Sequence, residues 1–112
     1  MKIDKRASDG VSILDLSGRL VIGNGGVELR ESVRDLLETG ENRVLLNMEA
    51  VSSIDSSGVG ELVSAYTTAS NQGGQLKLLN LPPQLHDVLV ITRLASVFEI
   101  HDDEAEAVDS FS

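Results

Sequence analysis

The sequence predicts an α/β fold, and three observations lead to that expectation. Short apolar runs alternate along the chain with segments whose apolar residues recur at helical spacing. The connections between them are short and rich in glycine, asparagine and proline. Such alternation is typical of a sheet whose central strands are parallel and joined through helices. The 112 residues fit one compact domain, and no linker, repeat or low-complexity segment divides them.

Two strands are expected at the amino-terminal end. Residues 2–7 are mostly polar and predict a short edge strand, and Asp9-Gly10 is a typical hairpin turn. Residues 11–17, VSILDLS, carry apolar side chains on both faces, as an interior strand does. The glycine-rich stretch IGNGG at residues 22–26 then predicts a flexible loop.

The middle of the chain predicts a helix, a buried strand and a second helix. Residues 27–38 place apolar side chains at i, i+4, i+7 and i+8, with Gly40 as the expected left-handed cap. Residues 43–48, RVLLNM, form a compact apolar run, which predicts a buried strand. Helical spacing resumes at Val59 and stops near Gly73.

The last third predicts strand, helix, strand and helix. Residues 75–79 are expected to form a third buried strand. Pro83 can occupy the first turn of a helix that runs to about Leu94, since its missing N–H costs nothing there. Residues 97–100 predict a short strand, and residues 102–108, DDEAEAV, a terminal acidic helix whose charged face is solvated.

Composition and charge exclude several classes of function. The net charge is −9, so a phosphate backbone would be repelled, and no nucleic acid partner is expected. Cysteine is absent, which removes disulfides and thiolate metal sites. His86 and His101 lie far apart in sequence with no third ligand at suitable spacing, so they are expected on the surface and no metal or other cofactor is expected. No apolar run resembles a signal peptide or a membrane span, which predicts a cytoplasmic protein without direct membrane insertion.

The stretch IDSSGVGEL, residues 54–62, is the strongest candidate site, because it falls between a strand and a helix. In one interpretation Ser56 or Ser57 simply caps the helix, worth about 1 kcal/mol, and Gly58 and Gly60 allow tight packing. In the other, one serine receives a phosphoryl group. Exposed N–H groups at the positive end of a helix suit an anion, and two serines exceed what a cap requires.

A phosphoryl group at Ser56 would add about −1.5 to −2 charges. Asp55 and Glu61 are close in sequence, so the local surface would become strongly negative. A partner fitted to the neutral hydroxyl would then lose its contact. The sequence thus allows a charge-controlled binding switch at this junction.

The longer stretch VLLNMEAVSSIDSSGVGEL, residues 44–62, resembles the signature of the STAS domain, the family of bacterial anti-sigma factor antagonists. Further similarity lies in SGRL at residues 17–20, in the Gly73-Gly74 turn before LKLLN, and in TRLASVFEIHDDEAEAV at residues 92–108. The resemblance extends over almost the whole chain and implies a single STAS domain over residues 1–112, with its core at about 2–108. It also implies a mixed sheet with parallel central strands and about four helices.

The resemblance implies a regulatory binding protein without catalytic chemistry. In that family the first serine after the aspartate is phosphorylated by a partner that is both a serine kinase and an anti-sigma factor, and a serine phosphatase resets it. Carried over, the phosphorylated residue is Ser56, with Ser57 as the cap. The sequence departs from the usual pattern at Val21 and at Asn47, where many members carry aspartate.

Two other classes of function stay open beside the switch. STAS domains also serve as scaffolds or adaptors, without phosphorylation, in signalling and lipid-transport complexes. A small serine hydrolase is the third, but neither histidine sits in a motif that supplies a base. The residues expected to bind the partner are those of the junction and of the preceding loop: Asp55, Ser56, Ser57, Gly58, Val59, Gly60, Val21, Ile22, Gly23 and Asn24.

Overall fold

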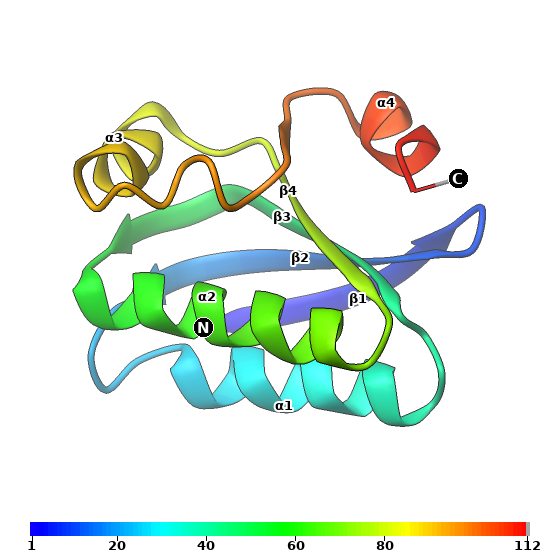
Figure 1. The fold of residues 1–112 in the computed structure, drawn as a ribbon. Coiled ribbons are helices and arrows are strands. Elements are labelled where there is room, and N and C mark those ends of the chain that lie inside the picture. Colours follow the sequence, from blue (N-terminus) through cyan, green and yellow to red (C-terminus); the bar gives the residue numbers. More distant parts are fainter. Residues whose placement is uncertain (112) are drawn as a thin grey trace.

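A five-stranded mixed sheet with helices on both sides forms the protein (Figure 1). The structure is a computed structural model, and it describes residues 1–111. The helices and strands within those residues are β1 (Lys2–Ser8), β2 (Val11–Leu20), α1 (Gly26–Glu38), β3 (Arg43–Ile54), α2 (Ser56–Asn71), β4 (Gln75–Leu79), α3 (Pro83–Ile91), β5 (Ile100–His101) and α4 (Glu104–Asp109).

The strands lie side by side in the order β1-β2-β3-β4-β5. The first pair is antiparallel and the other pairs are parallel, which confirms the expected mixed sheet with parallel central strands. Asp9 (φ 50°) and Gly10 (φ 80°) are both left-handed, as a tight two-residue hairpin requires. β1 is therefore the polar edge strand that the sequence predicts.

The central strand β3 is longer than predicted. It was expected to end at Met48 but continues to Ile54, paired with the end of β2. Of residues 49–54 only Val51 is buried, so this half of the strand lacks the continuous apolar character that marked the first half. The pairing with β2 is irregular beyond Asp15, because β3 carries one extra residue between the partners of Asp15 and Ser17 and another between those of Gly18 and Arg19.

Two carboxy-terminal predictions were also wrong in position. α3 ends at Ile91 instead of near Leu94, because Arg93 adopts a left-handed conformation (φ 62°) that stops the helix. β5 occupies residues 100–101 rather than 97–100, and Val97 instead lies in a turn, donating its N–H to Leu94 (3.0 Å). The apolar residues near Val97 therefore predicted this strand in the wrong place, because the extent of β5 depends on its pairing with β4.

The core has two parts, one on each side of the sheet. α1 and α2 lie side by side on one side, and α4 lies on the other (Figure 1). Val44 and Leu46 of β3 face the larger cluster under α1 and α2, while Leu45 belongs to the smaller cluster with α4. All three are fully buried, as a central parallel strand requires.

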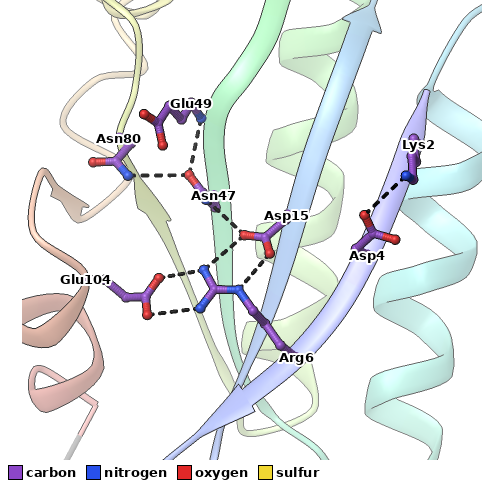
Figure 2. Close-up of polar contacts among 8 residues, drawn as sticks. All are labelled: Lys2, Asp4, Arg6, Asp15, Asn47, Glu49, Asn80 and Glu104. Carbon is purple, nitrogen blue, oxygen red and sulfur yellow. Dashed lines mark hydrogen bonds and ion pairs between the residues drawn. The ribbon is translucent and has the colours of Figure 1, made fainter.

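The acidic tail is not simply a solvated helix, which corrects the expectation. Ala107 and Val108 of α4 are buried against the sheet. Glu104 accepts a hydrogen bond from Arg6 of β1 (2.9 Å), and the same guanidinium donates to Asp15 of β2 (2.6 Å), as Figure 2 shows. This network, which sequence spacing could not reveal, ties the last helix to the first two strands.

The histidines differ in environment. His86 is exposed on α3 as expected. His101 is partly buried on β5, where its ring nitrogen lies 2.7 Å from Glu99, so its surface assignment was only partly right. None of the helices in residues 1–111 is both long and apolar enough to cross a membrane.

Candidate functional site

Asp55, and not a serine, caps α2. Its Oδ1 accepts a hydrogen bond from the Gly58 N–H (2.9 Å), and its backbone carbonyl accepts from Val59 (2.9 Å). The prediction that Ser56 or Ser57 caps the helix was therefore wrong. β3 continues to Ile54, so the helix begins at Ser56 and both serines already lie inside its first turn.

The other carboxylate oxygen of Asp55 reaches across to the loop after β2. Oδ2 accepts a hydrogen bond from the backbone N–H of Ile22 (3.0 Å). The N–H groups of Ile22 and then Gly58 hold the pKa of the Asp55 carboxyl below its usual range, because both stabilise its charged form. Asp55 thus joins two segments that are 33 residues apart.

Ser56 and Ser57 are both exposed, in the first turn of α2. Within residues 1–111 neither hydroxyl makes a hydrogen bond, so each is free to contact another molecule. Because the N–H groups at a helix start carry partial positive charge, an anion at Ser56 would sit in a favourable position relative to the helix itself.

The two glycines of the motif differ in their roles. A Cβ at Gly58 would overlap the carbonyl oxygen of Leu20, so this glycine lets the start of α2 press against the end of β2. A Cβ at Gly60 would meet nothing within 4 Å, and the residue is exposed. Tight packing is therefore confirmed at Gly58 and was wrongly expected at Gly60.

The loop after β2 is closed by hydrogen bonds at its tip. Val21 and Asn24 exchange two backbone hydrogen bonds (3.0 and 2.9 Å), with Gly23 left-handed at φ 75°. This turn presents Ile22, whose side chain is 78% exposed. At Gly25 a Cβ would lie 2.7 Å from the Arg19 carbonyl oxygen, so the base of the loop packs against the strand.

A small cleft of about 290 Å³ lies between this loop and α2. Ser57, Asn24 and Glu61 are among the residues that line it. Glu61 was expected to add free negative charge, but Arg30 of α1 lies 3.0 Å from its carboxylate and offsets that charge. Arg30 was not predicted as part of the site, because its ion pair with Glu61 joins two helices and leaves no pattern in the local sequence.

The structure brings the two predicted halves of the site together. The start of α2 and the loop after β2 lie at the same end of the molecule (Figure 1), joined through Asp55. Leu20 and Arg30 complete the surroundings and were not predicted. The predicted set that converges here comprises Val21, Ile22, Gly23, Asn24, Asp55, Ser56, Ser57, Gly58, Val59 and Gly60.

Asn47, one of the two departures from the usual pattern, has a clear structural role. Its Nδ2 donates to Asp15 Oδ1 (2.8 Å) in the polar network of Figure 2. Arg6 first, and Asn47 in addition, keep the pKa of the Asp15 carboxyl below its usual value. An aspartate at position 47 could not donate this bond, and its charge would oppose that of Asp15.

A mixed sheet with an Asp-Ser-Ser-Gly junction between a central strand and a helix defines an α/β domain of the STAS class. The chain belongs to that family, since the STAS domain model matches residues 2–107. This agrees with the resemblance seen in the sequence.

Known proteins of this family resemble the chain over most of its length. The anti-sigma-B factor antagonist of Bacillus subtilis is 29% identical over 100 residues, 89% of this chain and 90% of that protein. A candidate anti-sigma factor antagonist of Thermotoga maritima, known from a crystal structure, has 28% identity and a TM-score of 0.88 over 97% of this chain and 93% of its own.

The Bacillus cell fate determinant SpoIIAA in its phosphorylated form shares the fold. Its TM-score is 0.75 at 22% identity, covering 99% of this chain and 100% of that one. This likeness is one of fold.

Proposed function

We propose that this protein is an anti-sigma factor antagonist whose binding to an anti-sigma factor with serine kinase activity is switched off by phosphorylation of Ser56. The observation that carries the proposal is the exposed hydroxyl of Ser56, which has no hydrogen bond within residues 1–111 and lies in the first turn of α2. An enzyme bearing a nucleotide can approach such a hydroxyl without unfolding the domain.

Phosphoryl transfer to Ser56 requires no catalytic group from this chain. The Ser56 oxygen attacks the γ-phosphorus of ATP held by the kinase, the bond to the β-phosphate breaks, and ADP leaves. The hydroxyl proton passes to a base of the kinase. Hydrolysis by a phosphatase returns the hydroxyl and inorganic phosphate. This chain supplies the acceptor and the surface that positions it.

Added charge at Ser56 explains release of the partner. The neighbouring Asp55 is already anionic, held so by two backbone N–H groups. A phosphoryl group of about −1.5 to −2 charges beside it would make the surface anionic where the kinase docks. Burying that charge in an interface without a matched cation is unfavourable.

The relatives support the same function. The similar protein of Bacillus subtilis is named an anti-sigma-B factor antagonist, and SpoIIAA, with the same fold, has a phosphorylated form. We extend these properties to the present chain, with the partner surface formed by residues 21–24 and 55–60. The kinase and a phosphatase are the partners in this proposal.

Intact mass spectrometry tests the acceptor. The protein is incubated with ATP and a kinase from a neighbouring gene that binds it tightly and is demonstrably active. We expect a mass increase of one phosphoryl group in the native chain and in Ser57→Ala, and none in Ser56→Ala. The Ser57 variant is a matched control, because the Ser57 hydroxyl is also exposed and makes no hydrogen bond within residues 1–111.

Binding affinity tests the switch. Ser56→Glu should bind the kinase at least about tenfold more weakly than Ser56→Ala, a difference of about 1.4 kcal/mol. Equal affinities would contradict electrostatic release. Tight binding without any adduct would instead favour an adaptor that never carries phosphate. Serine-dependent turnover of ester or phosphoester substrates would favour a hydrolase.

A further inference from the structure

Asp55 occupies a position from which it can couple Ser56 to the loop after β2. We propose that Asp55 is a positioning residue that holds the Ile22 tip of this loop in its docking position, and that a phosphoryl group on Ser56 releases it. The inference rests on the proposed function, and it adds a local change of structure to what would otherwise be a change of charge alone.

The two oxygens of Asp55 serve different segments. Oδ1 accepts from Gly58 in the first turn of α2 (2.9 Å), and Oδ2 accepts from Ile22 in the loop (3.0 Å). Within the described residues the Ile22 N–H has no other partner. One carboxylate therefore sets where the loop tip lies relative to the helix start.

Loss of the hydrogen bond between Ile22 and Asp55 would change the structure of this loop only locally. Val21 and Asn24 bond to each other, so the turn keeps its shape. The base of the loop packs tightly, since a Cβ at Gly25 would lie 2.7 Å from the Arg19 carbonyl. Between these fixed points, the hydrogen bond from Ile22 to Asp55 ties the tip to the start of α2.

A phosphoryl group on Ser56 competes with Asp55 directly. The phosphoryl group is attached to Ser56, the residue after Asp55, and it carries more negative charge than a carboxylate. It can accept hydrogen bonds from the same N–H groups of the first helical turn. The two anions also repel each other. Asp55 is therefore displaced from its N–H partners, and the Ile22 bond is lost to water.

The displaced tip carries the most exposed apolar side chain of the site. Ile22 is 78% exposed and Val27, at the start of α1, is 55% exposed. Such side chains beside a polar acceptor serve as apolar anchors for a protein partner. The kinase thus loses the orientation of an anchor as well as a neutral contact surface.

Exchange of the Ile22 amide with water, measured by NMR, tests the coupling without a kinase. Ser56→Glu adds charge at the acceptor, and Asp55→Asn keeps one acceptor oxygen, so it can serve only one of the two N–H groups. We expect exchange at Ile22 to rise about tenfold in both, as loss of one hydrogen bond predicts. Ser64→Glu, an exposed position further along α2, should leave it unchanged.

The amide of Leu46, in the core of β3, reports whether either variant has lost global stability. Faster exchange at Ile22 with unchanged exchange at Leu46 supports the coupling. Unchanged exchange at Ile22 in Ser56→Glu and in the phosphorylated chain overturns it. If phosphorylation weakens kinase binding while Ile22 stays protected, the proposed function stands and this inference fails. If no adduct forms while Ser56→Glu still frees Ile22, Asp55 positions the loop, but the phosphoryl group as the trigger and the proposed function both fail.

Discussion

At the scale of single residues, the junction depends on side chains that accept or avoid specific backbone atoms. Asp55 accepts N–H groups from both sides of the site, and Gly58 leaves room for the Leu20 carbonyl. The sequence predicted that these residues shape the site. It did not predict which of them caps the helix, because aspartate and serine are nearly equal caps and the choice depends on where β3 ends.

The two motif glycines give a matched pair of substitutions. Gly58→Ala should destabilise the fold by about 1–3 kcal/mol, since the added methyl group overlaps a fixed carbonyl. Gly60→Ala should stabilise it by about 0.5–1 kcal/mol, because the methyl group meets nothing and alanine is the better helix former. Urea unfolding of both variants measures the difference. Equal effects at the two positions would mean that α2 does not press on β2.

At the scale of elements, contacts between distant segments decide where each strand and helix ends. β3 extends to Ile54 because it pairs with the end of β2, and β5 is limited to the two residues that pair with β4. α4 is held by a second polar cluster besides Arg6. Lys77 of β4 pairs with Glu99 (2.8 Å) and donates to the Ser110 carbonyl just beyond α4 (2.8 Å).

This cluster predicts a specific response to acid. The Lys77 ammonium first, and His101 next, lower the pKa of Glu99 from 4.5 to about 2. Since the folded value lies below the ordinary one, the stabilisation is complete above pH 4.5 and is lost as the pH falls toward 2. Between pH 4.5 and pH 2, the Tm of Glu99→Gln should therefore fall by less than the Tm of the native chain.

Glu31→Gln is the control for this comparison. Glu31 is exposed on α1 and makes no ion pair within residues 1–111, so its removal should leave the acid response as in the native chain. Thermal unfolding followed by circular dichroism at several pH values gives the three curves. A Glu99→Gln curve that runs parallel to the native one would show that the cluster does not stabilise the fold.

At the scale of the whole molecule, one sheet lies between two apolar clusters. β2, β3 and β4 contribute buried residues to both sides. Leu45 and Leu46 are neighbours on β3 and both are 0% exposed, yet they belong to different clusters. A defect on either side should therefore weaken the entire fold.

Leu45→Ala and Leu46→Ala test this expectation. Each should lower the free energy of unfolding by about 2–5 kcal/mol, with one cooperative transition, because each leaves a cavity in a fully buried layer. Val97→Ala, at a side chain 37% exposed, should change it by less than about 0.5 kcal/mol. A nearly neutral Leu45→Ala in denaturant unfolding would mean that α4 packs loosely and that the smaller cluster adds little.

By itself the sequence determined the α/β class, the order of strands and helices, and the junction where the site lies. These follow from local patterns: hydrophobic periodicity, turn residues and a motif of adjacent residues. The strand Gln75–Leu79 was predicted to the residue, because residues 76–79 are buried without a break and the polar Gln75 and Asn80 bound that run.

Only the tertiary structure decided the rest. The cap at Asp55, its bond to Ile22, the pairing of Arg30 with Glu61 and the docking of α4 through Arg6 all join residues that approach each other only after folding. Each depends on the direction of a side chain or the register of a strand. Such information lies in the pairing of distant segments and not in any one stretch of the chain.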